Sequence, residues 1–353
     1  MGKTGKKGVR NHRGHISWET VMKILFVHQK LMSFVEKDLE ILRSAHEVRE
    51  IQFRGMQDIP SLLEGTIWAD ITFSWFGKIH AFFAVLFSKM LGKKAVVVAG
   101  GDDVACEPHI KYGMFAYWWK KWCPLFVFRY ANLILCVSEF NKQETINNAR
   151  AEPEKIKMIY HGFSEVRFRR IKEISKENIV ITIGRVSKET LLKKGIELFI
   201  HAASHLPNIK FVLIGPDIDG SLKELSKLAP ENVALTGGKY GEELVALCNR
   251  AKVYVQVSTH ESFGCSIAEA MLCECIPVVS NRAAILEVVG DCGFYIKDMS
   301  PKSVAEQIKE ALLTPDDLGK KARERIKTLF PLEQRKCELL NAIESVCNGS
   351  LNK

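Results

Sequence analysis

Residues 251–280 read AKVYVQVSTHESFGCSIAEAMLCECIPVVS, which predicts a strand, a loop, a helix and a second strand in direct succession. The apolar runs Ala251–Ser258 and Cys275–Ser280 have the length and composition of buried parallel strands. Between them, a helical pattern begins at Ser266. The loop before this helix therefore presents backbone N–H groups at a helix N-terminus, which is a site for an anion such as a diphosphate.

Two carboxylates stand eight positions apart in this stretch. Glu261 lies in the loop, and we expect Glu269 in the first turn of the helix. In one interpretation, Ser266 and Glu269 form an S-x-x-E capping box and Glu261 is an exposed loop acid. In the other, the two acids contact opposite ends of a long ligand whose phosphates lie between them. This stretch alone leaves both interpretations open.

The run His260–Met271, followed by Ile276–Val279, resembles the E-x7-E signature of the retaining glycosyltransferases of family 4, which adopt the GT-B fold. The resemblance implies that Glu261 meets hydroxyls of the donor sugar and that Glu269 meets the ribose of the nucleotide. The family more often has Gly in place of Ser262 and an aliphatic residue at position 265. The resemblance also implies that the phosphates are held by the backbone amides of Phe263, Gly264, Cys265 and Ser266.

The composition is that of a globular protein with more than one domain. A chain of 353 residues is long for one core, so we expect two domains. The hydrophobic fraction of 47% and the charged fraction of 26% are ordinary for a soluble protein. No apolar run reaches the roughly 20 residues that span a bilayer, and no hydrophobic signal-peptide core is visible. We therefore expect a cytoplasmic protein.

The ten cysteines are scattered, mostly within apolar runs, as is typical of reduced thiols in a cytosolic protein. Cys273 and Cys275 form only a C-x-C, with no second pair and no His at a zinc-like spacing. We therefore expect no metal site.

The net charge of +9 is uneven, because about half of the excess lies in the first 23 residues. We expect residues 1–21 to form a disordered basic tail, and we expect no nucleic-acid partner.

Strands and helices alternate through the rest of the chain, which predicts an α/β protein with parallel sheets. Residues 22–166 and 179–330 each read as a Rossmann-like domain, joined by a charged linker at 167–178. With the resemblance above, this predicts the GT-B arrangement, in which an N-terminal acceptor domain and a C-terminal donor domain face a cleft. We expect the helix within 331–353 to cross back to the first domain. No G-x-G-x-x-G follows a strand, which disfavours an NAD-dependent dehydrogenase.

A basic pair lies at the same edge of the predicted C-terminal sheet as the loop that contains Glu261, called the donor loop below. Arg185 follows a Gly at the end of a strand, and Lys193 and Lys194 precede the Gly that opens the next helix. This resembles the family's G-R and K-G pair, which implies that Arg185 and Lys194 neutralise the donor diphosphate. Two such cations stabilise the leaving group without a metal. We interpret Lys193 as a solvated loop residue, and Tyr240 either stacks on the nucleobase or is an exposed loop aromatic.

The acceptor side carries two acids after a buried strand, in the turn Gly100-Gly101-Asp102-Asp103. Related enzymes often have a His-containing turn here. One acid would orient or deprotonate an acceptor hydroxyl and the other would cap the turn; we favour Asp103 for the first role. Weaker acceptor-side candidates are Asp102, His109 and His28.

Aromatic and basic residues interleave over Tyr112–Tyr130, and Phe73–Leu91 adds further aromatic residues. This pattern is typical of a bilayer interface, where rings lie at headgroup depth and cations meet anionic lipid. Plain domain core is the alternative. The first interpretation places the protein at the cytoplasmic face of a membrane.

The sequence thus predicts a retaining glycosyltransferase that moves a sugar from a UDP-, GDP- or ADP-linked donor to a hydroxyl of a glycan or lipid-linked acceptor. It predicts no cofactor beyond that nucleotide sugar. The alternatives are another GT-B activity, such as a sugar-nucleotide epimerase, and a non-catalytic nucleotide-sugar-binding protein.

Overall fold

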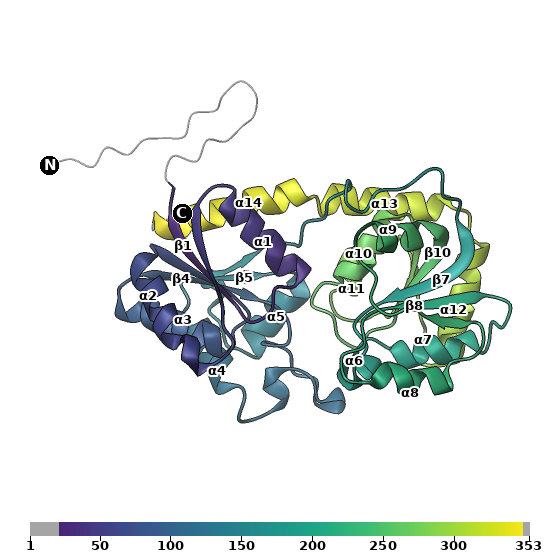
Figure 1. Cartoon of the computed structure of the whole chain (residues 1–353), viewed down its shortest axis with the longest axis horizontal. Coiled ribbons are helices and arrows are strands. Elements are labelled where there is room, and N and C mark those ends of the chain that lie inside the picture. Colours follow the sequence, from purple (N-terminus) through teal and green to yellow (C-terminus); the bar gives the residue numbers. More distant parts are fainter. Residues whose placement is uncertain (1–20, 349–353) are drawn as a thin grey trace, which may run out of the picture.

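A computed structural model describes residues 21–348 as two α/β lobes that lie side by side (Figure 1). The predicted basic tail lies outside this range except for Val21. Each lobe is built on a six-stranded parallel sheet. The α/β class, the parallel sheets and the two-domain arrangement are as the sequence predicts.

The N-terminal sheet has the strand order β2-β1-β3-β4-β5-β6. Its strands are β1 (Lys23–His28), β2 (Glu47–Gln52), β3 (Ile71–Trp75), β4 (Lys94–Ala99), β5 (Leu133–Cys136) and β6 (Ile156–Met158). Its helices are α1 (Ser33–Arg43), α2 (Ile59–Trp68), α3 (Ile79–Met90), α4 (Trp122–Tyr130) and α5 (Glu139–Asn147).

The C-terminal sheet has the order β12-β11-β10-β7-β8-β9. Its strands are β7 (Glu177–Ile183), β8 (Lys210–Ile214), β9 (Val233–Leu235), β10 (Ala251–Gln256), β11 (Ile276–Val279) and β12 (Phe294–Tyr295). The helices are α6 (Lys188–Lys193), α7 (Ile196–Ala203), α8 (Ser221–Leu228), α9 (Gly241–Arg250), α10 (Cys265–Leu272), α11 (Ile285–Val289), α12 (Pro301–Leu313), α13 (Asp317–Leu329) and α14 (Leu332–Cys347).

Central strands are mostly apolar because helices cover both faces of each sheet. Five of the six residues of β4 are fully buried, and so are the four residues of β5. Since every strand pair is parallel, the carboxyl ends of the strands in one sheet open at one edge. Ligands of open α/β sheets bind outside this edge.

The last helix returns to the first domain. Pro331 separates α13 from α14, and α14 then packs against α1 and β4 (Figure 1). Arg335 on α14 forms a buried pair with Asp38 on α1, with two N–O distances of 2.7 Å.

The structure corrects several boundaries. The strand β7 begins at Glu177, two residues inside the predicted linker, because it continues pairing to Ala251 of β10. Residues 188–193, predicted as a loop, form α6, which Ser187 caps by accepting from the Thr190 N–H. The helices α2 and α4 are also additions to the predicted elements.

Candidate active site

The carboxyl edges of the two sheets face each other, and their loops touch. The Ser138 hydroxyl donates to the Ser262 carbonyl at 2.6 Å. His260 hydrogen-bonds the Glu144 carboxylate at 2.9 Å, with the two side chains 0% and 11% exposed. Glu287 accepts the first two backbone N–H groups of α5 at 2.9 Å each. These contacts hold the loop after β10 against the N-terminal domain.

Glu261 is the centre of a polar cluster at the end of β10. Its Oε1 accepts from Gln256 at 2.7 Å and from Ser258 at 3.2 Å, and lies 3.3 Å from the Lys194 ammonium. Burial raises the pKa of Glu261, but the Lys194 and Lys193 cations outweigh it and hold the pKa below its ordinary value. The carboxylate is therefore ionised at neutral pH and is a hydrogen-bond acceptor.

The two predicted diphosphate cations lie near the same strand end. The Lys194 side chain passes over Gly184, where an added Cβ would come within 3.1 Å of the lysine Cδ. Arg185 follows Gly184 and is exposed, with no side-chain hydrogen bond or ion pair within residues 21–348. One cation is thus fixed beside Glu261, and the other is free to meet a ligand.

Lys193 differs from the prediction, because it is not a solvated loop residue. Its ammonium lies 3.8 Å from the centre of the Tyr112 ring, which belongs to the N-terminal domain. Burial lowers the pKa of Lys193, and the Glu261 carboxylate partly opposes this effect. No local sequence pattern indicates this contact, since the two residues are on different domains.

The loop before α10 ends in unpaired donors. The backbone N–H groups of residues 263–266 have no acceptor within the described part of the chain. Gly264 is the N-cap of α10, and its φ of 101° lets the chain turn from the loop into the helix. Four N–H groups without an acceptor at a helix N-terminus favour an anion.

The capping-box interpretation is wrong, and so is the placement of Glu269 in the first turn. Because α10 begins at Cys265, Glu269 is in its second turn. The Ser266 hydroxyl donates to Gln256 at 2.9 Å and caps nothing.

Glu269 is half-buried and forms no hydrogen bond or ion pair within residues 21–348. Burial raises its pKa, and the Lys37 and Arg167 cations act against that rise. An acid that is partly desolvated but has no partner is suited to accept hydrogen bonds from ligand hydroxyls.

Two of the predicted donor residues contribute through their backbone only. The Phe263 ring is 2% exposed and packs between the domains, so it does not line the site. Burial raises the pKa of the Cys265 thiol to about 12, which keeps it neutral at physiological pH. The rings around Phe263 are those of Tyr160, His161, Phe163 and Phe330.

The structure reverses the assignment of the acceptor-side acids. Asp103 is fully buried and accepts the backbone N–H groups of Gly77, Gly100 and Gly101 at 2.6, 3.0 and 2.8 Å, so it is the residue that fixes the turn. Burial, with Asp102 beside it, raises the pKa of Asp103 to about 7.

Asp102 is the partly exposed acid of the pair, and it lies 2.5 Å from the Lys78 ammonium. Burial lowers the pKa of Lys78, but the Asp102 charge and hydrogen bond produce a net rise. Lys78 is a residue that the sequence analysis missed. Its only signal is its position just after the end of β3.

Within residues 21–348, the remaining candidates form no hydrogen bond or ion pair with Glu261, Lys194 or Asp102. His28 is buried and bonds Glu50 at 2.9 Å, which is a structural contact between β1 and β2. His109 is exposed in a short 3-10 helix. Tyr240 is 71% exposed at the start of α9.

Gly101 lies where the loops of the two domains pack closely against each other. A Cβ built there would lie 2.0 Å from the Ser262 Oγ, and the φ of 126° is one that only glycine adopts readily. We expect Gly101→Ala to lower kcat/KM at least ~10-fold by forcing the loops apart, since small displacements of catalytic groups are costly. Steady-state kinetics will measure this.

Gly220 is the matched control, because it has a φ of 85° and nothing within 4 Å of an added Cβ. Gly220→Ala should leave kcat/KM within about twofold. Adding Ser262→Ala to Gly101→Ala should restore part of the activity; equal activity of wild type and Gly101→Ala would contradict the closed arrangement.

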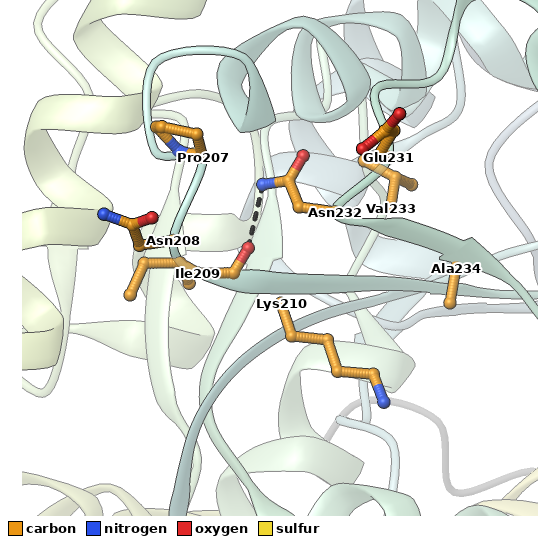
Figure 2. A pocket seen from close by; sticks show the side chains of 8 residues that line it. All are labelled: Pro207, Asn208, Ile209, Lys210, Glu231, Asn232, Val233 and Ala234. Carbon is orange, nitrogen blue, oxygen red and sulfur yellow. Dashed lines mark hydrogen bonds between the residues drawn. The ribbon is translucent and has the colours of Figure 1, made fainter.

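A separate hollow of about 330 Å³ lies at the amino ends of β8 and β9, opposite the site (Figure 2). Asn232 at its wall donates to the carbonyls of Ala203, Leu206 and Ile209, so it ties a turn together. Within residues 21–348, no group of three or more His, Cys, Asp or Glu side chains is arranged to hold a metal ion.

Comparison with known proteins shows which proteins this chain resembles. The family model described as glycosyl transferases group 1 matches residues 164–328, which contain Arg185, Lys194, Glu261 and Glu269. The GDP-mannose:cellobiosyl-diphosphopolyprenol alpha-mannosyltransferase of Xanthomonas oryzae pv. oryzae is 23% identical over 292 residues, or 78% of this chain and 75% of that relative.

A second relative is N-acetylgalactosamine-N,N'-diacetylbacillosaminyl-diphospho-undecaprenol 4-alpha-N-acetylgalactosaminyltransferase of Campylobacter jejuni. It is 22% identical over 255 residues, which are 70% of this chain and 68% of that relative. Among solved structures, Anabaena Alr3699/HepE in complex with UDP and glucose has the same fold, with a TM-score of 0.76 and 18% identity over 92% of this chain and 100% of that chain. The C-terminal domain thus matches the glycosyl transferases group 1 model, and the fold of the chain is GT-B.

Proposed function

We propose that the protein is a retaining glycosyltransferase that moves a sugar from a nucleotide sugar to a hydroxyl of a glycan or lipid-linked acceptor. The observation that carries the proposal is the Glu261–Lys194 pair beside the unpaired N–H groups of residues 263–266. The amides, Lys194 and Arg185 bind the diphosphate, and Glu261 accepts hydrogen bonds from the sugar. Glu269 meets the ribose.

In the reaction, the acceptor oxygen forms a bond to the anomeric carbon while the bond from that carbon to the diphosphate oxygen breaks. Attack on the face from which the diphosphate leaves retains the configuration, as the family resemblance implies. The acceptor proton passes to the departing phosphate. Lys194 and Arg185 stabilise the charge that develops there, so this route requires no metal.

The donor is a UDP-, GDP- or ADP-linked sugar. Two observations favour a GDP- or UDP-linked sugar: the Xanthomonas relative is named for GDP-mannose, and the Anabaena structure contains UDP. A thermal-shift screen of the three nucleotides, followed by transfer assays with the corresponding sugars and a membrane extract, will test the function. Transfer products support it; an epimerised nucleotide sugar, or binding without turnover, would support one of the two alternatives.

We also propose that the acceptor is met at a membrane surface. Three tryptophans at the start of α4 and just before it, Trp118, Trp119 and Trp122, are 78%, 51% and 52% exposed, with Lys120 and Lys121 between them (Figure 1). Rings and cations in this arrangement favour an anionic bilayer interface. Both relatives described above are named for acceptors on a lipid diphosphate.

Several aromatic residues of the two stretches are buried and therefore do not belong to this surface. Within Phe73–Leu91, Phe73 and Trp75 are core residues, as are Tyr112 and Phe128 of the second stretch, so the membrane-facing part is smaller than the sequence indicated. No helix within residues 21–348 has the length and apolarity to span a bilayer.

Replacing Trp118, Trp119 and Trp122 together by Ser should lower binding to vesicles that contain anionic lipid at least ~10-fold, because ring burial at the interface is lost. Sedimentation with the vesicles will measure this. Tyr240→Ser is the control, since Tyr240 is as exposed but lies on the other domain. Unchanged binding of the triple variant would contradict the membrane surface.

A further inference from the structure

Tyr112 belongs to the N-terminal domain but lies among residues of the C-terminal domain. It follows β4 in a loop that is closed by two backbone hydrogen bonds with Glu107, each 3.0 Å long. Its ring centre lies 3.8 Å from the Lys193 ammonium and 5.1 Å from the His260 ring. The residue is only 7% exposed. The ring is thus held by two residues that flank the donor loop.

The Tyr112 hydroxyl, in contrast, has no hydrogen-bond partner among the residues that the structure describes. It is not one of the fully buried polar atoms that lack a partner, so its oxygen keeps some access from outside the protein. It lies 3.9 Å from the position of an added Cβ on Gly101, where the loops of the two domains meet. A donor that no protein group uses, on a ring that is otherwise buried, is open to a ligand group. The position of this hydroxyl therefore indicates a ligand group.

The charges around the hydroxyl identify the chemistry of that group. Burial raises the pKa of Tyr112 well above its ordinary value, and Asp102 and Glu261 raise it further. The phenol therefore keeps its proton and donates it. The Glu261 carboxylate only accepts. A sugar hydroxyl accepts from Tyr112 and donates to Glu261 at the same time, which fits the proposed substrate.

We propose that Tyr112 is a substrate-positioning residue whose hydroxyl donates to a sugar hydroxyl at the domain junction, while that sugar hydroxyl donates to Glu261. This inference rests on the proposed glycosyl transfer. Lys193 and His260 hold the ring, so the phenol is in place before the substrate arrives. The sugar hydroxyl belongs either to the donor sugar or to the acceptor, and the experiment separates the two.

Tyr112→Phe is the first test, because it keeps the ring and its contacts with Lys193 and His260. We expect kcat/KM for transfer to fall about 10- to 100-fold, as for the loss of one hydrogen bond in a desolvated site. Calorimetric binding of free UDP or GDP should be unchanged. Tyr117→Phe is the control on the same loop, since the Tyr117 hydroxyl donates to the Lys111 carbonyl instead; its kcat/KM should match wild type.

Deoxy analogues provide the second test, which compares substrates within one variant and so tolerates some loss of stability. In wild type, removing one sugar hydroxyl should lower kcat/KM about 10-fold or more. In Tyr112→Phe, removing the same hydroxyl should lower kcat/KM less than threefold. A deoxy donor with this behaviour assigns the hydroxyl to the donor sugar, and a deoxy acceptor assigns it to the acceptor.

Equal kcat/KM for Tyr112→Phe and wild type, or an undiminished penalty at every deoxy position, would overturn this inference and leave the proposed function intact. Absence of transfer by wild type across all donors would overturn the proposed function and this inference with it.

Discussion

Glu261→Gln should lower kcat about 10²- to 10³-fold, the range seen when one preorganised electrostatic contact to a transition state is removed. The amide keeps the shape of the side chain but loses its charge and one acceptor site. The sugar hydroxyls then lose their strongest partner in the cluster of Gln256, Ser258 and Lys194. Single-turnover and steady-state kinetics with the preferred donor will measure the effect.

Glu261→Gln should not weaken the binding of the free nucleotide, in contrast to its effect on kcat. Without the carboxylate 3.3 Å away, the Lys194 ammonium is free for the diphosphate, so Glu261→Gln should bind UDP or GDP as tightly as wild type or more tightly. Lys194→Met should weaken that binding at least ~10-fold, because it removes a cation from the anion site. This contrast separates a sugar contact from a phosphate contact.

Glu274→Gln is the control for a lost carboxylate in the same domain, since Glu274 pairs with Arg170 at 3.2 Å away from the donor loop. Its kcat should remain within about twofold of wild type. If Glu261→Gln retained full kcat, Glu261 would be a structural residue of the loop and the donor site would have to lie elsewhere.

The local pattern of the sequence predicted the fold because strands buried on both faces read as continuous apolar runs, as in β4 and β10. The helices α2 and α4 were missed because each carries a Pro near its start, and α2 also has Gly65 within it. Gly65 is required by packing, since an added Cβ would lie 2.7 Å from a Leu25 methyl group. Such tertiary requirements leave little trace in helix propensity.

For the site, the spacing around Glu261 predicted the loop at a helix N-terminus, because that geometry is local in sequence. The structure was needed to distinguish Asp102 from Asp103, since both are acids in one turn and only the backbone path shows which points inward. It was also needed for Lys78, Lys193 and Tyr112. The contact of Lys193 with Tyr112 joins segments that meet only when the two domains face each other. Lys78 meets Asp102 across two strand ends of one domain, and no periodicity encodes either contact.

Arg335→Met should destabilise the protein by about 3–5 kcal/mol, because it leaves the buried Asp38 carboxylate without its partner. Both side chains are buried, at 3% and 0% exposure, and the guanidinium also donates to the carbonyls of Ile159 and Tyr160. Since Arg335 is on α14 and Asp38 on α1, the same substitution should release the last helix from the first domain. Urea unfolding and protease cleavage near Pro331 will measure these effects.

The exposed pair of Arg250 and Glu177 is the matched control. It has similar geometry, with N–O distances of 2.7 and 3.1 Å, but both side chains are 46% exposed. Arg250→Met should therefore cost less than about 1 kcal/mol. The double variant Arg335→Met/Asp38→Leu should recover much of the loss, because the unpaired charge is gone. Equal destabilisation by Arg335→Met and Arg250→Met would mean that burial does not set the strength of the α1–α14 connection.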